Sequence, residues 1–273
     1  MAYTQAQLLA QNSRAFASPA IPAEPLFRRT RCDEPRIAIL PERGGRTRVA
    51  IDTPCRAEQS VVLAYAGAVF IRLLDTHGSG EFVLDCFAGE AEAVTISFED
   101  NTKIVRQPVA ADMREISKVA IVWTDTVDLD LHAFAYAAEF NGHGHAWSGN
   151  PGSFDEASTR ARQDGRGQGF LSTTGAGGEI GMNFEVYTFV HQAGQTPGSV
   201  KLAIDYKTRG SRPADSFCGN GHLAEVRFKA YVMERGQPAR QFDLAFGAVS
   251  CGTDLSVRAR FNSRLIPELA IRG

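Results

Sequence analysis

An acidic segment that ends in a histidine is the first place in the chain where side-chain chemistry is concentrated. Asp125, Asp128 and Asp130 precede His132 there. Ca²⁺ takes six to eight oxygen ligands, and closely spaced carboxylates beside a loop can supply some of them. Residues two apart in a strand share a face, so Asp128, Asp130 and His132 would lie together. Two interpretations fit: a calcium site formed by the three aspartates, or a solvated strand face.

The histidines His143 and His145 raise the question of a zinc centre or a metal-dependent hydrolase. A zinc site needs three or four ligands in near-tetrahedral geometry, and neither an HExxH nor a CxxC motif supplies them. A hydrolase would have to use Asp128, Asp130 and His145 around a bound metal. The chain also has no Gly-x-Ser-x-Gly nucleophile motif. We therefore expect no enzymatic activity, and no cofactor apart from the calcium ion considered above.

A glycine-rich segment at 141–181 contains eleven glycines and predicts a long binding loop. Aromatic and amide side chains accompany it. An aromatic ring can cover the apolar face of a sugar, while amides pair with its hydroxyls. The candidate carbohydrate-binding residues are Trp147, Asn150, Phe154, Gln168, Phe170 and Asn183. The alternative is that these rings belong to a β-sandwich core, which buries most of its aromatic residues.

Short runs of alternating polarity, separated by turn residues, position these candidates. They predict strands at 36–40, 46–52, 60–65, 69–74, 81–84, 93–98, 116–123, 128–136, 183–189, 199–206, 224–233 and 241–246. Spacing of about 8–12 residues is typical of β-sandwiches. We therefore expect an all-β protein with two β-sandwich domains, Ig-like or jelly-roll-like, at 32–108 and 109–273.

The first 31 residues predict an arm ahead of these domains. Leu8, Leu9 and Phe16 recur at helical spacing, which indicates a short helix. Such a helix is marginal in water unless it packs on a partner surface. Three prolines then predict an extended linker. The arm is either a docking peptide for another protein subunit or a disordered tail.

The composition excludes several classes of partner. Lys and Arg total 29 against 31 Asp and Glu, so the formal charge of -2 gives no general attraction to nucleic acid. No apolar run approaches the roughly 20 residues that span a bilayer. The first residues lack the basic and apolar regions of a signal peptide, so we expect no export signal there.

The five cysteines leave their pairing open. Cys32 with Cys55, and Cys218 with Cys251, each fall within one predicted domain. Either pair could form a disulfide, but connectivity does not follow from sequence. The alternative is that they are small buried apolar residues, which is the interpretation that we favour for Cys86.

From Cys32 onward the chain resembles an uncharacterised family of bacterial envelope proteins with two small β domains. The matching residues are Cys32, Pro54-Cys55, Gly67, Leu74-Asp75, Gly78, Leu131-His132-Ala133, Gly144-His145-Ala146-Trp147, Glu185–Phe189, Cys218-Gly219 and Cys251. The segment 123–132 also resembles a second domain family of unknown function found in exported bacterial proteins. Neither resemblance implies a catalytic residue.

Members of the envelope family usually begin with an export or membrane signal and a long proline-rich linker, and here a short arm takes that place. Phage-like particles and gene-transfer agents leave the cell by lysis, so a protein displayed on them needs no export signal. A short arm ahead of β domains therefore suits a spike, decoration or fibre of such a particle. We expect a non-enzymatic, oligomeric or assembled surface protein that binds cell-surface polysaccharide. The alternative is a periplasmic or envelope-anchored protein with disulfides at Cys32–Cys55 and Cys218–Cys251.

Overall fold

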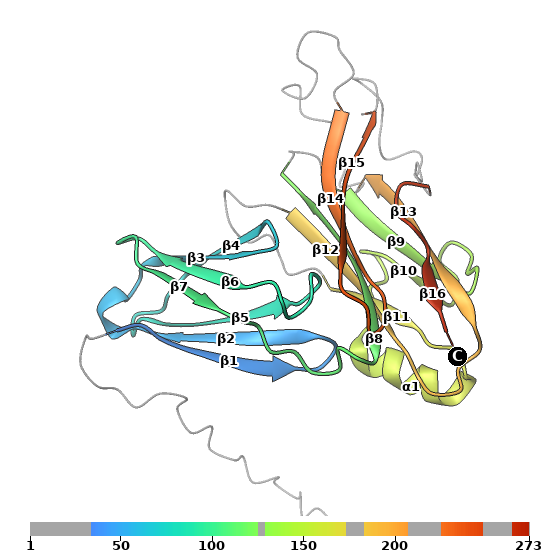
Figure 1. Cartoon of the computed structure of the whole chain (residues 1–273), viewed down its shortest axis with the longest axis horizontal. Helices are drawn as coiled ribbons and strands as arrows, with labels where there is room; N and C mark the ends of the chain where they lie inside the picture. Colours follow the sequence, from blue (N-terminus) through green and yellow to red (C-terminus); the bar gives the residue numbers. More distant parts are fainter. Residues whose placement is uncertain (1–33, 125–128, 173–182, 207–224, 248–263, 273) are drawn as a thin grey trace, which may run out of the picture. The chain divides into compact units, whose positions relative to one another are not determined.

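The computed structural model describes residues 34–124, 129–172, 183–206, 225–247 and 264–272. These residues form four antiparallel β-sheets and one α-helix, so the prediction of an all-β protein is confirmed (Figure 1). The predicted arm at 1–31, with Leu8, Leu9 and Phe16, lies outside the described residues. Within them, no helix is long and apolar enough to cross a membrane.

The segment predicted as the first domain forms two of the sheets. Its strands are β1 (Arg36–Glu42), β2 (Arg46–Asp52), β3 (Ser60–Tyr65), β4 (Ala68–Leu73), β5 (Ser79–Asp85), β6 (Val94–Phe98) and β7 (Lys103–Arg106), with a 3-10 turn at Pro54–Arg56. One sheet has the order β1-β2-β5 and the other β4-β3-β6-β7. Residues of β3 and β6 alternate between buried and half-buried, because one face of their sheet packs on a core.

The segment predicted as the second domain forms the other two sheets. Its elements are β8 (Ile116–Trp123), β9 (Leu129–Ala135), β10 (His145–Ala146), α1 (Phe154–Asp164), β11 (Gly169–Ser172), β12 (Asn183–Val190), β13 (Gly198–Tyr206), β14 (Glu225–Met233), β15 (Arg240–Gly247) and β16 (Leu269–Ile271). The five-stranded sheet has the order β11-β12-β8-β14-β15, and the four-stranded sheet the order β10-β9-β13-β16.

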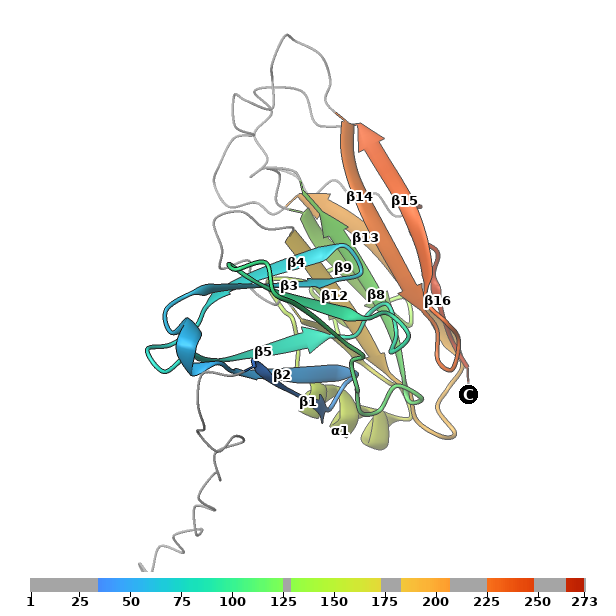
Figure 2. The ribbon, with the colours of Figure 1, turned by 60° about the vertical axis from the view of Figure 1, so that its left-hand side comes forward.

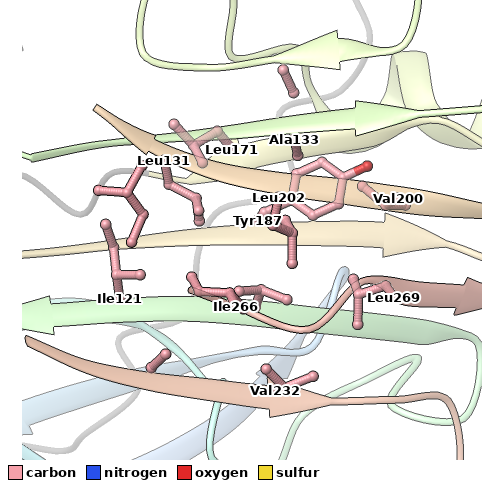
Figure 3. Close-up of a cluster of buried hydrophobic side chains, with 14 of the residues drawn as sticks. Ile121, Leu131, Ala133, Leu171, Tyr187, Val200, Leu202, Val232, Ile266 and Leu269 are labelled. Carbon is pink, nitrogen blue, oxygen red and sulfur yellow. The ribbon is translucent and has the colours of Figure 1, made fainter. Parts of the chain in front are cut away.

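These two sheets pack face to face. The core between them takes Ile121 and Val232 from the five-stranded sheet and Leu131 and Leu202 from the four-stranded sheet (Figure 3). Tyr187 is fully buried in the same layer. Apolar side chains from two sheets interdigitating in this way define a β-sandwich.

The opposite face of the five-stranded sheet is buried as well. Ala120, Val122 and Tyr231 belong to a second core that also contains Leu63 and Ile96 from the first segment. Every residue of β8 is therefore buried, which explains its continuous apolar sequence. Strands pair only within each predicted domain, yet Arg31–Gly273 forms one compact unit.

A buried ion pair crosses between the two segments. Lys118 of β8 is fully buried, and its Nζ donates to Asp85 Oδ1 at 2.5 Å, to Gly44 O at 2.8 Å and to Thr188 Oγ1 at 3.0 Å. Ser172 Oγ donates to the other carboxylate oxygen of Asp85 at 2.7 Å. Several hydrogen bonds thus compensate for removing both charges from water.

The glycine-rich segment is the main departure from expectation. It is not a continuous loop, because it contains α1 as well as β10 and β11. The Ser153 side chain accepts a hydrogen bond from the backbone N–H of Glu156, and Gly165 ends the helix with a φ of +63°. A serine three residues before a glutamate is the capping-box pattern. The helix packs against β11 and β12 (Figures 1 and 2).

Candidate functional site

A small polar pocket lies between the turn that follows β9 and the helix α1. We call it the helix pocket. Its volume is about 250 Å³. It is lined by Asn141, Gly142, His143, Gly144, His145, Asn150, Gly152, Glu156, Arg160 and Gln168. All of these residues come from one continuous stretch of 28 residues, 141–168, so local folding of the chain forms the whole pocket.

The turns between β9 and β10 have several residues in the left-handed backbone conformation, and they lead to the residues that line the pocket. Tyr136, Ala137 and Asn141 all have positive φ, which is uncommon for residues other than glycine. Gly144 has a φ of +90°, and a Cβ at this position would lie 2.9 Å from Ala135 O. A glycine is therefore required where the returning chain passes closest to the end of β9.

Two buried histidines form the floor beneath the pocket, and the structure fixes their tautomers. The backbone N–H of Asn141 donates to His145 Nδ1 at 2.9 Å, so the ring hydrogen of His145 is on Nε2. That nitrogen lies 2.9 Å from His132 Nδ1 and donates to it. The hydrogen of His132 is consequently on Nε2, which faces Asp130 Oδ2 at 3.7 Å. Both His132 and His145 must be neutral, because each accepts a hydrogen bond at its Nδ1.

Burial favours the same neutral forms. It lowers the pKa of His132 to about 4 and that of His145 to about 4. Removing an imidazole from water disfavours its charged form, because the protein interior solvates the charge poorly. The two histidines are therefore uncharged at neutral pH.

Aromatic rings surround this histidine pair. The ring centroids of His145 and Phe134 are 4.3 Å apart at an interplanar angle of 2°, and those of His132 and Trp147 are 5.4 Å apart at 14°. Phe140 lies 5.6 Å from Trp147 and 5.0 Å from His145, and it is 47% exposed. An aromatic surface thus reaches solvent beside the helix pocket.

Asp130 is held by the turn that carries Trp147. Ser148 donates to it twice, from the backbone N at 3.1 Å and from Oγ at 2.7 Å. Asp130 and His132 are both buried, so the interpretation of this strand face as solvated is wrong. Asp205 of β13, which the sequence did not single out, lies directly opposite Asp130 and shares its face.

Of the three aspartates of the predicted calcium site, the structure describes only Asp130. Asp125 and Asp128 lie outside the described residues. In the described part of the chain, no three His, Cys, Asp or Glu side chains are grouped so as to hold a metal ion. The calcium site stays a prediction, and so does the hydrolase that would use Asp128, Asp130 and His145.

The six predicted carbohydrate-binding residues are divided among three places. Asn150 and Gln168 line the helix pocket, and Trp147 stacks on its histidine floor. Phe154 and Phe170 pack edge to face, 6.1 Å apart, beside a separate pocket of about 600 Å³. Phe170 is buried, as expected for a core ring.

The sixth residue, Asn183, pairs with Trp123 in the five-stranded sheet. It therefore lies away from both groups. Three side chains that line the helix pocket, Asn141, Glu156 and Arg160, are not among the ligand candidates predicted from the sequence. The capping-box spacing of Ser153 and Glu156 could have revealed the helix that positions the last two.

A third buried histidine lies beside a serine at another place in the fold. Gln195 Nε2 donates to His191 Nδ1 at 2.9 Å, because Gln195 Oε1 already accepts from the backbone N–H of Gln192. The hydrogen of His191 is therefore on Nε2 and points to Ser117 Oγ at 2.7 Å. In this arrangement the imidazole cannot accept the serine proton, and the pair joins the ends of β8 and β12.

The cysteines are described in part. Cys55 is disulfide-bonded, and Cys86 is a buried free thiol. Cys32, Cys218 and Cys251 lie outside the described residues. The proposed pairings Cys32–Cys55 and Cys218–Cys251 stay predictions, whereas the burial of Cys86 is confirmed.

The fold and the site together define an all-β protein with a local polar pocket on a sandwich. Comparison of the chain with family models, curated proteins and solved structures finds no match.

Proposed function

We propose that this chain is a non-enzymatic structural and binding protein, displayed on a phage-like particle or on the bacterial surface. In this proposal the helix pocket recognises cell-surface polysaccharide. Residues 1–31 anchor the chain to other protein subunits.

The chemistry of the helix pocket carries the proposal. The side-chain amides of Asn141 and Gln168 line it and have no hydrogen-bond partner among the described residues. Amide groups both donate and accept, as sugar hydroxyls require. The half-exposed ring of Phe140 precedes Asn141 in the chain and packs against His145, which lines the pocket, so it can cover the apolar face of a sugar.

The rigidity of the floor supports the same function. The hydrogen-bonded His132–His145 pair and the Ser148–Asp130 bonds fix the turns that carry the pocket residues. A site whose side chains are held before binding loses less conformational entropy when the ligand arrives. Such preorganisation suits a weakly interacting ligand such as a sugar.

A glycan array tests the proposal directly. We expect the wild-type chain to bind a subset of bacterial surface polysaccharides, and Gln168→Ala and Gln168→Leu to weaken that binding about tenfold each. Gln241→Ala is the matched control, because Gln241 is exposed on β15 away from the pocket. Failure of the wild type to bind any glycan, or equal binding by the pocket variants, would contradict the proposal.

One observation favours the envelope alternative. The disulfide at Cys55 is expected for a protein of an oxidising compartment such as the periplasm. Free thiols at all cysteines in protein taken from its native location would count against that alternative. If the chain is recovered with purified phage-like particles, and deletion of residues 1–31 abolishes this recovery, display on a particle would be supported.

A further inference from the structure

We propose that the helix pocket selects an acidic sugar and that Arg160 receives the carboxylate of a uronic acid residue. This inference rests on the proposed polysaccharide binding, and it specifies the class of sugar. The observation behind it is a guanidinium group that lines the pocket and hydrogen-bonds to an imidazole instead of a carboxylate.

Arg160 does not pair with Glu156, an acidic residue of the same helix. Glu156 precedes it by four residues, which is the favourable spacing and order for a helical ion pair. Instead, Arg160 Nη1 donates to His143 Nδ1 at 2.8 Å. Among the side chains that the structure describes, no carboxylate lies within ion-pairing distance of Arg160. The charge of its guanidinium is therefore not neutralised by the protein there.

Glu156, the one carboxylate that lines the pocket, is engaged at the start of the helix. Ser153 Oγ donates to Glu156 Oε2 at 3.0 Å, while the backbone N–H of Glu156 lies 3.2 Å from Ser153 Oγ. This capping arrangement turns Glu156 back towards the helix N-terminus. An incoming carboxylate thus meets Arg160 without displacing an existing ion pair.

His143 adds a second donor to the same end of the pocket. Its Nδ1 accepts from Arg160, so its ring hydrogen is on Nε2. A guanidinium binds a carboxylate through two parallel hydrogen bonds, which are stronger than bonds between neutral groups. Exchange of a neutral imidazole for a carboxylate is therefore favourable for Arg160.

The dimensions of the pocket limit the ligand to one sugar residue. Its volume of about 250 Å³ is smaller than the roughly 300–1,000 Å³ of pockets that hold drug-sized ligands. The free amides of Asn141 and Gln168 remain to pair with the ring hydroxyls. We infer that one acidic residue of a longer polysaccharide enters the pocket while its neighbours remain in solvent.

The experiment compares each acidic polysaccharide with its carboxyl-reduced form, which keeps the sugar ring and loses the charge. Oligosaccharides of galacturonate, glucuronate and mannuronate serve as probes in calorimetry with the full chain. We expect at least about tenfold tighter binding of one acidic probe than of its reduced form. This preference should weaken at high salt, because the pocket is open to solvent.

Substitutions on α1 assign the preference to a residue. Arg160→Gln should bind the acidic and reduced forms equally, and Arg160→Lys should keep part of the preference because it lacks the planar fork. Arg162→Gln is the matched control, since Arg162 is exposed on the same helix and does not line the pocket. Equal thermal midpoints would show that all variants fold.

The outcomes separate this inference from the proposed function. If the wild type binds acidic and reduced probes equally, polysaccharide binding stands and the assignment to acidic sugars is overturned. If Arg160→Gln keeps the wild-type preference, the role of Arg160 is overturned. If no glycan binds, the proposed function fails, and this inference fails with it.

Discussion

Acidification should destabilise the fold through the buried histidine pair beneath the helix pocket. His132 and His145 each use one ring nitrogen as an acceptor, so protonation of either ring replaces an accepted hydrogen bond with two facing donors. It also places a charge among the aromatic rings of the floor. The folded state therefore resists protonation, whereas the unfolded chain does not.

The size of the effect follows from the two pKa values. Each histidine has a folded pKa of about 4, against about 6.5 in an unfolded chain. The unfolded state binds more protons between these values, so the free energy of unfolding decreases as pH falls through this window and is unaffected above it. Near pH 5 the loss is about 2 kcal/mol for each histidine, before repulsion between the two sites is counted.

Urea unfolding at a series of pH values measures this loss. His191 also has a folded pKa of about 4 because of burial, so the comparison must be made between variants. His132→Asn keeps a polar side chain and removes one titration, and we expect it to lose about 2 kcal/mol less than the wild type between about pH 7 and pH 5. His77→Asn is the control, since His77 is exposed. A wild-type stability that is flat over this range, or equal pH slopes in the wild type and His132→Asn, would refute the reasoning.

Three further predictions concern a close contact, a buried ion pair and a helix cap. Gly169→Ala would place a Cβ 2.1 Å from the ring of Tyr187 and should cost about 1–3 kcal/mol in urea unfolding; a neutral result would show that the ring can move aside. Lys118→Met leaves Asp85 as a buried charge and should cost about 3–5 kcal/mol, and an unchanged thermal midpoint would contradict this. Ser153→Ala removes the helix cap and should cost about 1 kcal/mol, whereas Ser153→Asp should restore most of it.

The long strands could be predicted from the sequence because alternation records which face is buried. The twelve predicted strands all coincide with observed strands to within a few residues. Among the strands in the described ranges, those missed were β7, β10, β11 and β16, which are short. In strands of two to four residues the alternation has too few repeats to be distinguished from a turn.

The helix α1 escaped prediction for a different reason. Among its described side chains, Phe154 and Ala157 pack in a core, so its apolar face gives only a weak periodic signal in the sequence. The glycines on both sides then favoured a loop. Its capping residues, Ser153 and Glu156, were the local evidence for a helix, and they act independently of hydrophobic periodicity.

The burial of Asp130 and His132 could not be read from alternation at all. A period of two residues distinguishes the two faces of a strand, but it does not say what covers the second face. Here the turn that carries Trp147 and Ser148 folds over it and supplies the hydrogen bonds that make polar burial tolerable. Burial of this face depends on contacts between residues about 15 or more positions apart in the sequence, such as His132 with Trp147. A local sequence pattern does not encode such contacts.

Burial of both faces of β9 has a consequence for any test of function. Leu131 and Ala133 pack in the sandwich core, while His132 and Phe134 form the floor of the site. A substitution in the floor therefore alters stability and binding together, and a loss of binding would not identify a ligand contact. Arg160 and Gln168 line the pocket and do not belong to the described cores. Substitutions at these residues are consequently the ones from which a change in affinity can be assigned to recognition.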